Sequence, residues 1–282
     1  MTGFYKIEGS ISFENSGGAI DHRAAYAGLK GGFGDLLLGY RDTPFKDIRG
    51  KFDVFGDTVG DARNIIGSID VNLFDQRAKN ALMYSSPNAG GFQANVMYST
   101  SWEGKTTAQA GQDNNNDNLM SVNFLYKIKT ITLAAGLEQQ KHIDATTGDT
   151  THKGTGTRLV GTYALQNMRF GLIYENLDDD TSKSLRRTAY GANFVLKTGN
   201  GKVKLQYIQA GDTDAASASG ATEVAVGYDY KLDKNSSTYV AYSSVSNDKN
   251  ASYLMGNGHD QKYTTAAGEN INALSAGYIY SF

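Results

Sequence analysis

The chain alternates apolar and polar residues in short segments from one end to the other. In segment 270–282, every second position from 274 onward carries Leu, Ala, Tyr, Tyr and finally Phe. Successive side chains of a β-strand point to opposite faces, so these five residues share one face of a strand. Segments 92–99, 167–175 and 222–230 show the same period. A chain with this pattern throughout is expected to fold into amphipathic β-strands.

The alternation predicts fourteen strands, which together account for most of the chain. Their predicted ranges are 4–13, 22–31, 33–41, 77–87, 91–99, 118–127, 130–141, 156–164, 167–176, 187–197, 201–210, 221–231, 236–246 and 270–282.

Short turns alternate with long polar loops between these strands, and the longest loop is 42–76. Outer-membrane β-barrels have this layout, with short periplasmic turns and longer extracellular loops. Neither proline interrupts a predicted strand, since Pro44 falls in the longest loop and Pro87 at a turn. The sequence therefore predicts an all-β fold, a transmembrane antiparallel β-barrel that residues 1–282 form as a single domain.

The composition argues against helical membrane proteins and nucleic-acid-binding proteins. Mean hydropathy is −0.43, and no uninterrupted apolar run approaches the ~18 residues that a membrane-spanning helix needs. The net charge of −2 gives no bulk attraction for nucleic acid. A soluble barrel or sandwich, with the apolar face in its core, is the alternative fold. The membrane barrel is favoured because the apolar stripes often end in Tyr, as an aromatic girdle requires, and the opposite face suits a wet lumen.

Several motifs in 23–98 occur in an order and spacing that identify a family. They are Arg23–Gly31, Gly32–Gly39, Asp42–Lys46, Phe74–Arg77 and Tyr84–Asn88. Together with the ending Gly277–Phe282, they resemble the general trimeric porins of Gram-negative bacteria. From 100 to 270 the resemblance lies in the layout of strands and loops.

The resemblance implies a function that requires neither a catalysed reaction nor a cofactor. A porin of this family lies in the outer membrane among lipids, forms a homotrimer, and lets small hydrophilic solutes and ions diffuse passively through a water-filled pore. The resemblance also implies that loop 42–76 folds back into the pore, and that the terminal Phe282 serves as an assembly signal. We therefore expect a general porin and not an enzyme.

The start of the chain departs from the family pattern. The family has sixteen strands and places five before the inserted loop, whereas three are predicted here, and 1–6 lacks the features of a signal peptide. We therefore expect that the first two strands and the signal peptide are missing from this sequence. The alternative is a barrel of fourteen strands closed between 4–13 and 270–282.

Loop 42–76 contains the acids expected at the pore constriction. Asp53, Asp57 and Asp61 are spaced four residues apart and would share one face of a short helix within 53–66. In an ordinary loop such a face is merely solvated. The porin resemblance implies instead that these acids face the pore.

The bases expected opposite the acids come from the predicted strands. Arg77 and Lys79 directly follow the loop, and Lys6 and Lys30 occupy the polar phase of their strands. Arg41 is a further base expected at the constriction. It is displaced by one residue relative to the family, with Tyr40 in the place of the family's Arg, so it would lie near the rim if its side chain points outward. Acids and bases opposed across a narrow pore would create a transverse field that sets ion preference.

Other possibilities are open at this stage. A barrel enzyme would need a His on the wall, and only His22 is placed near one; no His shows the spacing of metal ligands. Surface loops that serve adhesion or receptor roles are compatible with a pore. Trp102 opens a loop and is predicted to mark the outer membrane interface.

Overall fold

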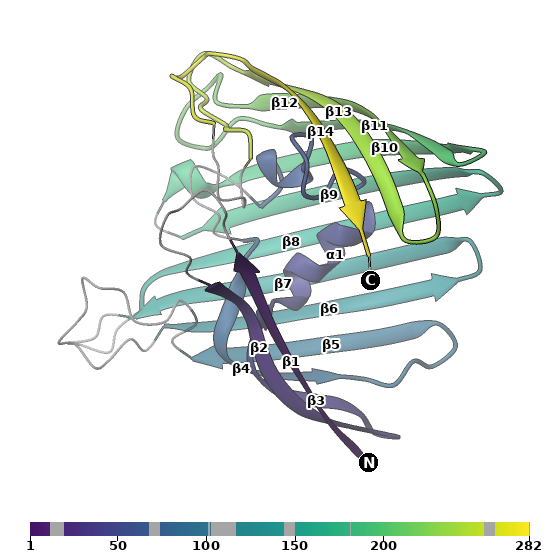
Figure 1. Ribbon diagram of the computed structural model, residues 1–282. Coiled ribbons are helices and arrows are strands. Elements are labelled where there is room, and N and C mark those ends of the chain that lie inside the picture. Colours follow the sequence, from purple (N-terminus) through teal and green to yellow (C-terminus); the bar gives the residue numbers. More distant parts are fainter. Residues whose placement is uncertain are drawn as a thin grey trace.

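The strands form one antiparallel sheet in which each strand pairs with its neighbours in the sequence. The computed structural model describes residues 1–11, 20–67, 74–100, 102, 117–143, 150–180, 182–256 and 263–281. Figure 1 shows the sheet curving around an interior segment. The strands are β1 (Thr2–Ile11), β2 (Ile20–Gly31), β3 (Gly34–Asp42), β4 (Arg77–Ser85), β5 (Phe92–Thr100), β6 (Asn118–Ile128), β7 (Ile131–Ile143), β8 (Thr150–Leu165), β9 (Met168–Asp179), β10 (Arg187–Thr198), β11 (Gly201–Ala210), β12 (Ala221–Lys231), β13 (Ser236–Asn247) and β14 (Ile271–Tyr280).

All fourteen predicted strands are confirmed, most of them within two residues of the predicted bounds. The largest difference lies in β8, which begins at Thr150 and not at 156. There the β7–β8 ladder continues through the pair His142 and His152. Both faces of this extension are polar, so the alternation that marks a half-buried strand is absent from the sequence.

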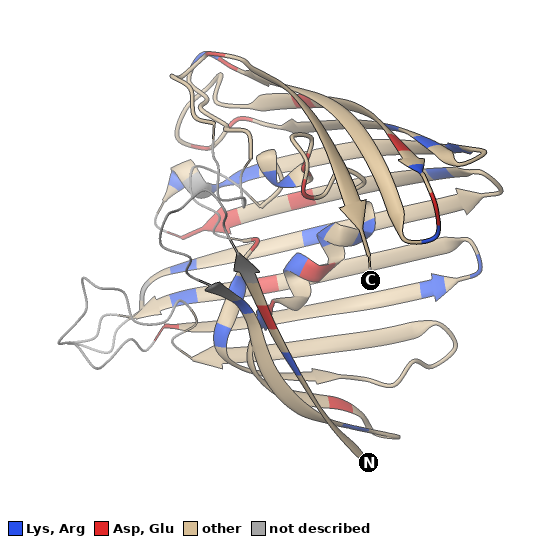
Figure 2. Cartoon of the chain, in the orientation of Figure 1, with Lys and Arg blue, Asp and Glu red and all other residues tan. Residues whose placement is uncertain are grey.

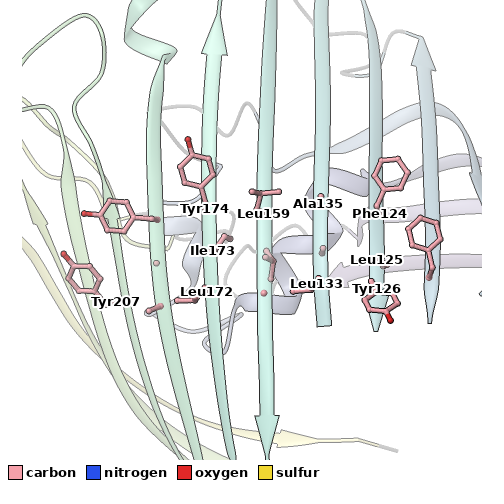
Figure 3. A pocket seen from close by; sticks show the side chains of 17 residues that line it. Phe124, Leu125, Tyr126, Leu133, Ala135, Leu159, Leu172, Ile173, Tyr174 and Tyr207 are labelled. Atoms are coloured by element: carbon pink, nitrogen blue, oxygen red, sulfur yellow. The ribbon is translucent and has the colours of Figure 1, made fainter. Parts of the chain in front are cut away.

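The apolar face of the sheet points outward. On β3, Leu36 and Leu38 are 40% and 64% exposed, whereas Leu37 between them is 4% exposed. An apolar hollow of about 790 Å³ lies on the outer wall. Figure 3 shows Phe124, Tyr126 and other rings around its leucine side chains. An outer surface this apolar is suited to lipid, so the soluble alternative is wrong.

The inner face carries the buried polar residues. Five examples from four different strands are all buried, namely Asn95, Ser121, Asn123, Gln140 and Glu223. This arrangement is the reverse of a soluble barrel, in which the interior is apolar.

The two edges of the sheet are β1 and β14. No pairing joins them in the part of the chain that the structure describes, so the closure required by the fourteen-strand alternative is not present there. The prediction of two further strands stays a prediction. None of the described helices is long and apolar enough to cross a membrane.

Helix α1 (Pro44–Phe52) opens the long segment between β3 and β4. Thr43 caps it, since its hydroxyl accepts a hydrogen bond from the Lys46 backbone N–H at 3.2 Å, and Pro44 occupies the first turn. The predicted helix that would carry Asp53, Asp57 and Asp61 on one face is wrong, since only the three residues Ala62–Asn64 of 53–66 are helical. The Asp53 and Asp61 carboxylates accept hydrogen bonds from backbone N–H groups two residues ahead, which favours turns over a continuous helix.

Two short 3₁₀ helices complete the secondary structure of the described residues. They are η1 (Ala62–Asn64), at the far end of the inserted segment, and η3 (Lys183–Leu185), between β9 and β10.

Candidate functional site: the inserted loop and the pore

The segment between β3 and β4 lies against the inner wall of the sheet. Figure 1 shows α1 inside the curve of the sheet, and it packs on β5 to β9. Phe45, Ile48 and Phe52 on α1 are fully buried. At Gly156 on β8, a Cβ would lie 2.9 Å from side-chain carbons of both Phe45 and Phe74. Glycine here therefore permits the close approach of the segment to the wall.

Wall side chains hold the backbone of the segment at successive strands. Each donates a hydrogen bond to a backbone carbonyl of the segment, and the contact points move along the segment as the strands advance from β6 to β11. The pairs are Asn123 with Pro44 at 2.6 Å, Arg158 with Phe45 at 2.9 Å, Asn193 with Phe52 at 2.6 Å and Gln206 with Gly60 at 2.8 Å. The segment thus crosses the interior along the wall, in agreement with the predicted inserted loop 42–76.

Arg49 on α1 gathers three carboxylates inside the loop. Its guanidinium lies 2.6 Å from Asp53, 3.4 Å from Asp61 and 3.0 Å from Asp75. Burial and the adjacent Asp61 carboxylate raise the pKa of Asp53 to about 7, although Arg49 opposes the rise. Burial alone would raise the pKa of Asp75, but Arg49 and other basic neighbours lower it below the ordinary value.

Glu175 on β9 fastens this cluster to the wall. Its carboxylate lies 2.5 Å from Arg158 and 3.1 Å from Arg187, and it accepts a hydrogen bond from the Gly67 backbone N–H at 2.8 Å. The side chains of Arg158, Arg187 and Glu175 are all fully buried. A buried charge must be paired to be tolerated, so this network fixes the loop in one position.

The structure separates the three predicted loop acids into two groups. The side chains of Asp53 and Asp61 are 3% and 0% exposed, because Arg49 and Arg63 enclose them. The side chain of Asp57 is 83% exposed. Only Asp57 of the three therefore presents its carboxylate to open solvent.

A second, half-buried acid of the loop meets a base from the wall. Asp47 on α1 lies 2.8 Å from the Arg41 guanidinium of β3, which also sits 5.6 Å from the ring centroid of Tyr26. Both residues line a polar cavity of about 370 Å³, together with Lys51, Gln93, Asn95 and other side chains of β3 to β6. Arg41, one of the bases predicted for the constriction, thus lies beside the loop.

Three other predicted bases pair with acids on the strands, and not with Asp53, Asp57 or Asp61. Arg77 lies 3.2 Å from Asp42, Lys6 2.5 Å from Glu8, and Lys30 3.5 Å from Asp35.

Lys79 lines a separate hollow with Ala25 and Tyr40. Ala25 on β2 and Tyr40 on β3 are register partners, so their side chains point to the same side of the sheet. Tyr26 follows Ala25 and therefore points to the opposite, inner side, where its ring contacts Arg41. The structure therefore places Lys79 beside residues of the outer side of the wall.

The sequence reasoning missed a group of bases on β9 to β12. Figure 2 shows basic residues gathered where these strands meet their short turns. Lys197, Lys202 and Lys231 line a cavity of about 530 Å³ there, which the loop borders at Val54 and Gly56. Each lies in the polar phase of its strand, so the signal was present, but only the strand register shows that they converge.

Trp102 does not mark the outer interface as predicted. It is fully buried and packs with Met83, Met97 and Leu119 in an apolar cluster. Phe282, the predicted assembly signal, lies outside the described residues. In the described ranges, no group of three or more His, Cys, Asp or Glu residues could hold a metal ion.

An antiparallel sheet with a lipid-compatible outer face, a polar inner face and a loop fixed inside defines a channel protein of the outer membrane. The family model of the Gram-negative porins matches residues 2–250. The chain therefore belongs to the Gram-negative porin family. It is an outer-membrane porin through which solutes diffuse passively.

Solved structures share the fold. The anion-selective porin from Comamonas acidovorans has 23% identity and a TM-score of 0.81, covering 99% of this chain and 84% of that one. The Salmonella typhi OmpF complex with daunomycin has 15% identity and a TM-score of 0.71, with 98% and 84% covered. OmpT of Vibrio cholerae in its trimer form has 15% identity and a TM-score of 0.65, with 98% and 86% covered. No curated protein matches the sequence.

Proposed function

We propose that the chain is a general porin whose constriction lies between the exposed edge of the inserted loop and the wall of β3 to β5. The contact of Arg41 with Asp47 beside a polar cavity carries this proposal. Asp57 adds a further acid on the exposed edge. Asp53 and Asp61 then act indirectly, by holding the loop through Arg49.

Charge at this constriction should set ion preference. Arg41 and Asp47 carry opposite charges, so their removal should have opposite effects on permeating ions. In planar bilayers under a salt gradient, Arg41→Gln should shift the reversal potential toward cation preference, and Asp47→Asn toward anion preference. Arg77→Gln, Lys6→Gln and Lys30→Gln should have smaller effects, because these bases pair with acids of β1 and β3, whereas Arg41 pairs with an acid of the inserted loop. Unchanged reversal potentials in both Arg41→Gln and Asp47→Asn would refute the assignment.

We also propose that the chain assembles as a homotrimer. One relative is described in a trimer form. In this chain, Leu274 and Tyr278 of β14 are 71% and 61% exposed on the edge of the sheet. An exposed apolar edge is suited to contact with a neighbouring subunit. A native mass measurement in mild detergent tests this proposal, and a monomer at every concentration would contradict it.

The proposed mechanism involves no bond making or breaking. Solutes move down their gradients through the aqueous space beside the loop, and the protein contributes only pore size and charge. We therefore propose no enzyme activity for the chain.

A further inference from the structure

A second cavity with marked charge lies at the end of the sheet where the short turns are. Its lining includes five lysines, Lys197, Lys202, Lys204, Lys231 and Lys234, and two aspartates. The short turns of outer-membrane barrels are periplasmic, so this cavity lies at the periplasmic mouth of the pore.

The two aspartates of this cavity are already engaged. Asp229 lies 2.7 Å from the Lys204 Nζ, which also sits 4.7 Å from the ring centroid of Phe55 on the loop. Asp233 accepts hydrogen bonds from the Asn235 and Ser236 backbone N–H groups at 2.7 and 2.9 Å. The Ser236 hydroxyl donates a third at 2.6 Å. Asp229 is thus paired with Lys204, whereas Asp233 interacts electrostatically with Lys231. The other four lysines share this single carboxylate, so five lysines less two aspartates leave an excess of three positive charges in the cavity.

Those four lysines have no ion-pair partner among the described residues, and all four are exposed. Lys197 and Lys202 are directly opposed in the β10–β11 register, and Lys202 is opposed to Asp229 in the β11–β12 register. Opposed residues of neighbouring strands point to the same side, so both ammonium groups project from one inner face. Like charges in this position are destabilising unless an anion lies between them.

We propose that this lysine pocket, defined by Lys197, Lys202, Lys231 and Lys234, binds small multivalent anions at the periplasmic mouth. The proposal rests on the porin function and specifies a class of solute for it. A single lysine attracts an exposed anion weakly in water. An anion with several charges interacts with several lysines at once, whereas chloride does not, so the pocket selects carboxylates and phosphates that carry two or more charges.

Pyrophosphate added to planar bilayers that contain the full chain tests the pocket. The triple variant Lys197→Gln/Lys202→Gln/Lys231→Gln removes three charges and leaves Lys204, which packs on the loop, in place. The matched control is Lys129→Gln/Lys183→Gln/Lys249→Gln, three exposed lysines outside the pocket. Pyrophosphate on the short-turn side should reduce the chloride current of the native protein and of the control.

The triple variant should need at least about fivefold more pyrophosphate for the same block at 0.1 M salt, where the Debye length is about 10 Å. At 1 M salt it falls to about 3 Å and the difference should vanish. The corresponding triple Lys→Arg variant should restore the block, and Lys202→Gln alone should weaken it about twofold, which provides a test if the triple variant does not insert.

The possible failures are distinguishable. Equal block of the triple variant and the control, or no block of the native channel, would overturn the lysine pocket while leaving the porin function intact. Absence of any conductance step from the native protein would instead refute the porin proposal.

Discussion

Arg158 is the residue on which the position of the inserted loop depends most. Its guanidinium has no exposed surface, binds Glu175 at 2.5 Å, and donates hydrogen bonds to the carbonyls of Phe45 at 2.9 Å and Phe74 at 3.3 Å. The substitution Arg158→Met keeps most of the volume and removes the charge and the donors. Glu175 is then left with Arg187 as its basic partner in this network.

The expected loss follows from this burial. Removing one partner of a buried ion pair costs about 3–5 kcal/mol. Arg158→Met also takes this donor from the carbonyls of Phe45 and Phe74. Lys30→Gln is the control, since it breaks an exposed pair with Asp35 that is worth about 0–1 kcal/mol. A loss of 3 kcal/mol corresponds to more than a hundredfold change in the folding equilibrium.

Urea unfolding followed by heat-modifiable mobility measures the loss, and single-channel recording reports the loop. Arg158→Met should lower the free energy of unfolding by about 3–5 kcal/mol and give larger or noisier conductance steps, because a released loop no longer narrows the pore. Glu175→Gln should be at least as damaging, since it leaves Arg158 and Arg187 without their shared carboxylate. A loss below about 1 kcal/mol in both variants would refute the anchoring role of the network.

Two further predictions concern the same loop. The Asp53 pKa of about 7 exceeds its ordinary 3.8, so the folded protein binds a proton that the unfolded chain releases. The free energy of unfolding should therefore fall as pH rises from about 4 to about 7. Urea titrations at several pH values should show that the free energy of unfolding falls less with pH in Asp53→Asn than in the native protein. In the control Asp57→Asn, whose side chain is exposed, it should fall as much as in the native protein. The same pH dependence in both variants would contradict the assignment. Gly156→Ala should cost about 1–3 kcal/mol through overpacking against Phe45. Gly161→Ala on the same strand is the control, because its Cβ would have its nearest contact at 3.6 Å, and equal losses would count against the packing argument.

The strands and their connections were determined by the sequence itself. A period of two residues appears in the sequence wherever one face of a strand is polar and the other apolar, so all fourteen strands could be predicted. The same alternation shows which side chains share a face. Where both faces are polar, as at the start of β8, the signal is lost and the boundary was wrong.

The site depended on tertiary structure. The spacing of Asp53, Asp57 and Asp61 predicted one helical face, but the helix ends before them, and Arg49 draws two of the three acids into the interior. The sequence alone does not show this pairing, because Arg49 and Asp75 meet only after the loop has folded back on itself.

The charges on the wall of the barrel also could not be placed from the sequence, because their neighbours are set by folding. The polar phase of each strand identifies Lys197 and Lys202 as inward-facing candidates, yet their convergence in one pocket follows from the strand register and the curvature of the sheet. Trp102 likewise looked interfacial in the sequence, although packing against Met83 and Met97 places it inside. Local periodicity thus determines the strands, whereas the positions of the charges in the pore are determined by contacts between residues far apart in the chain.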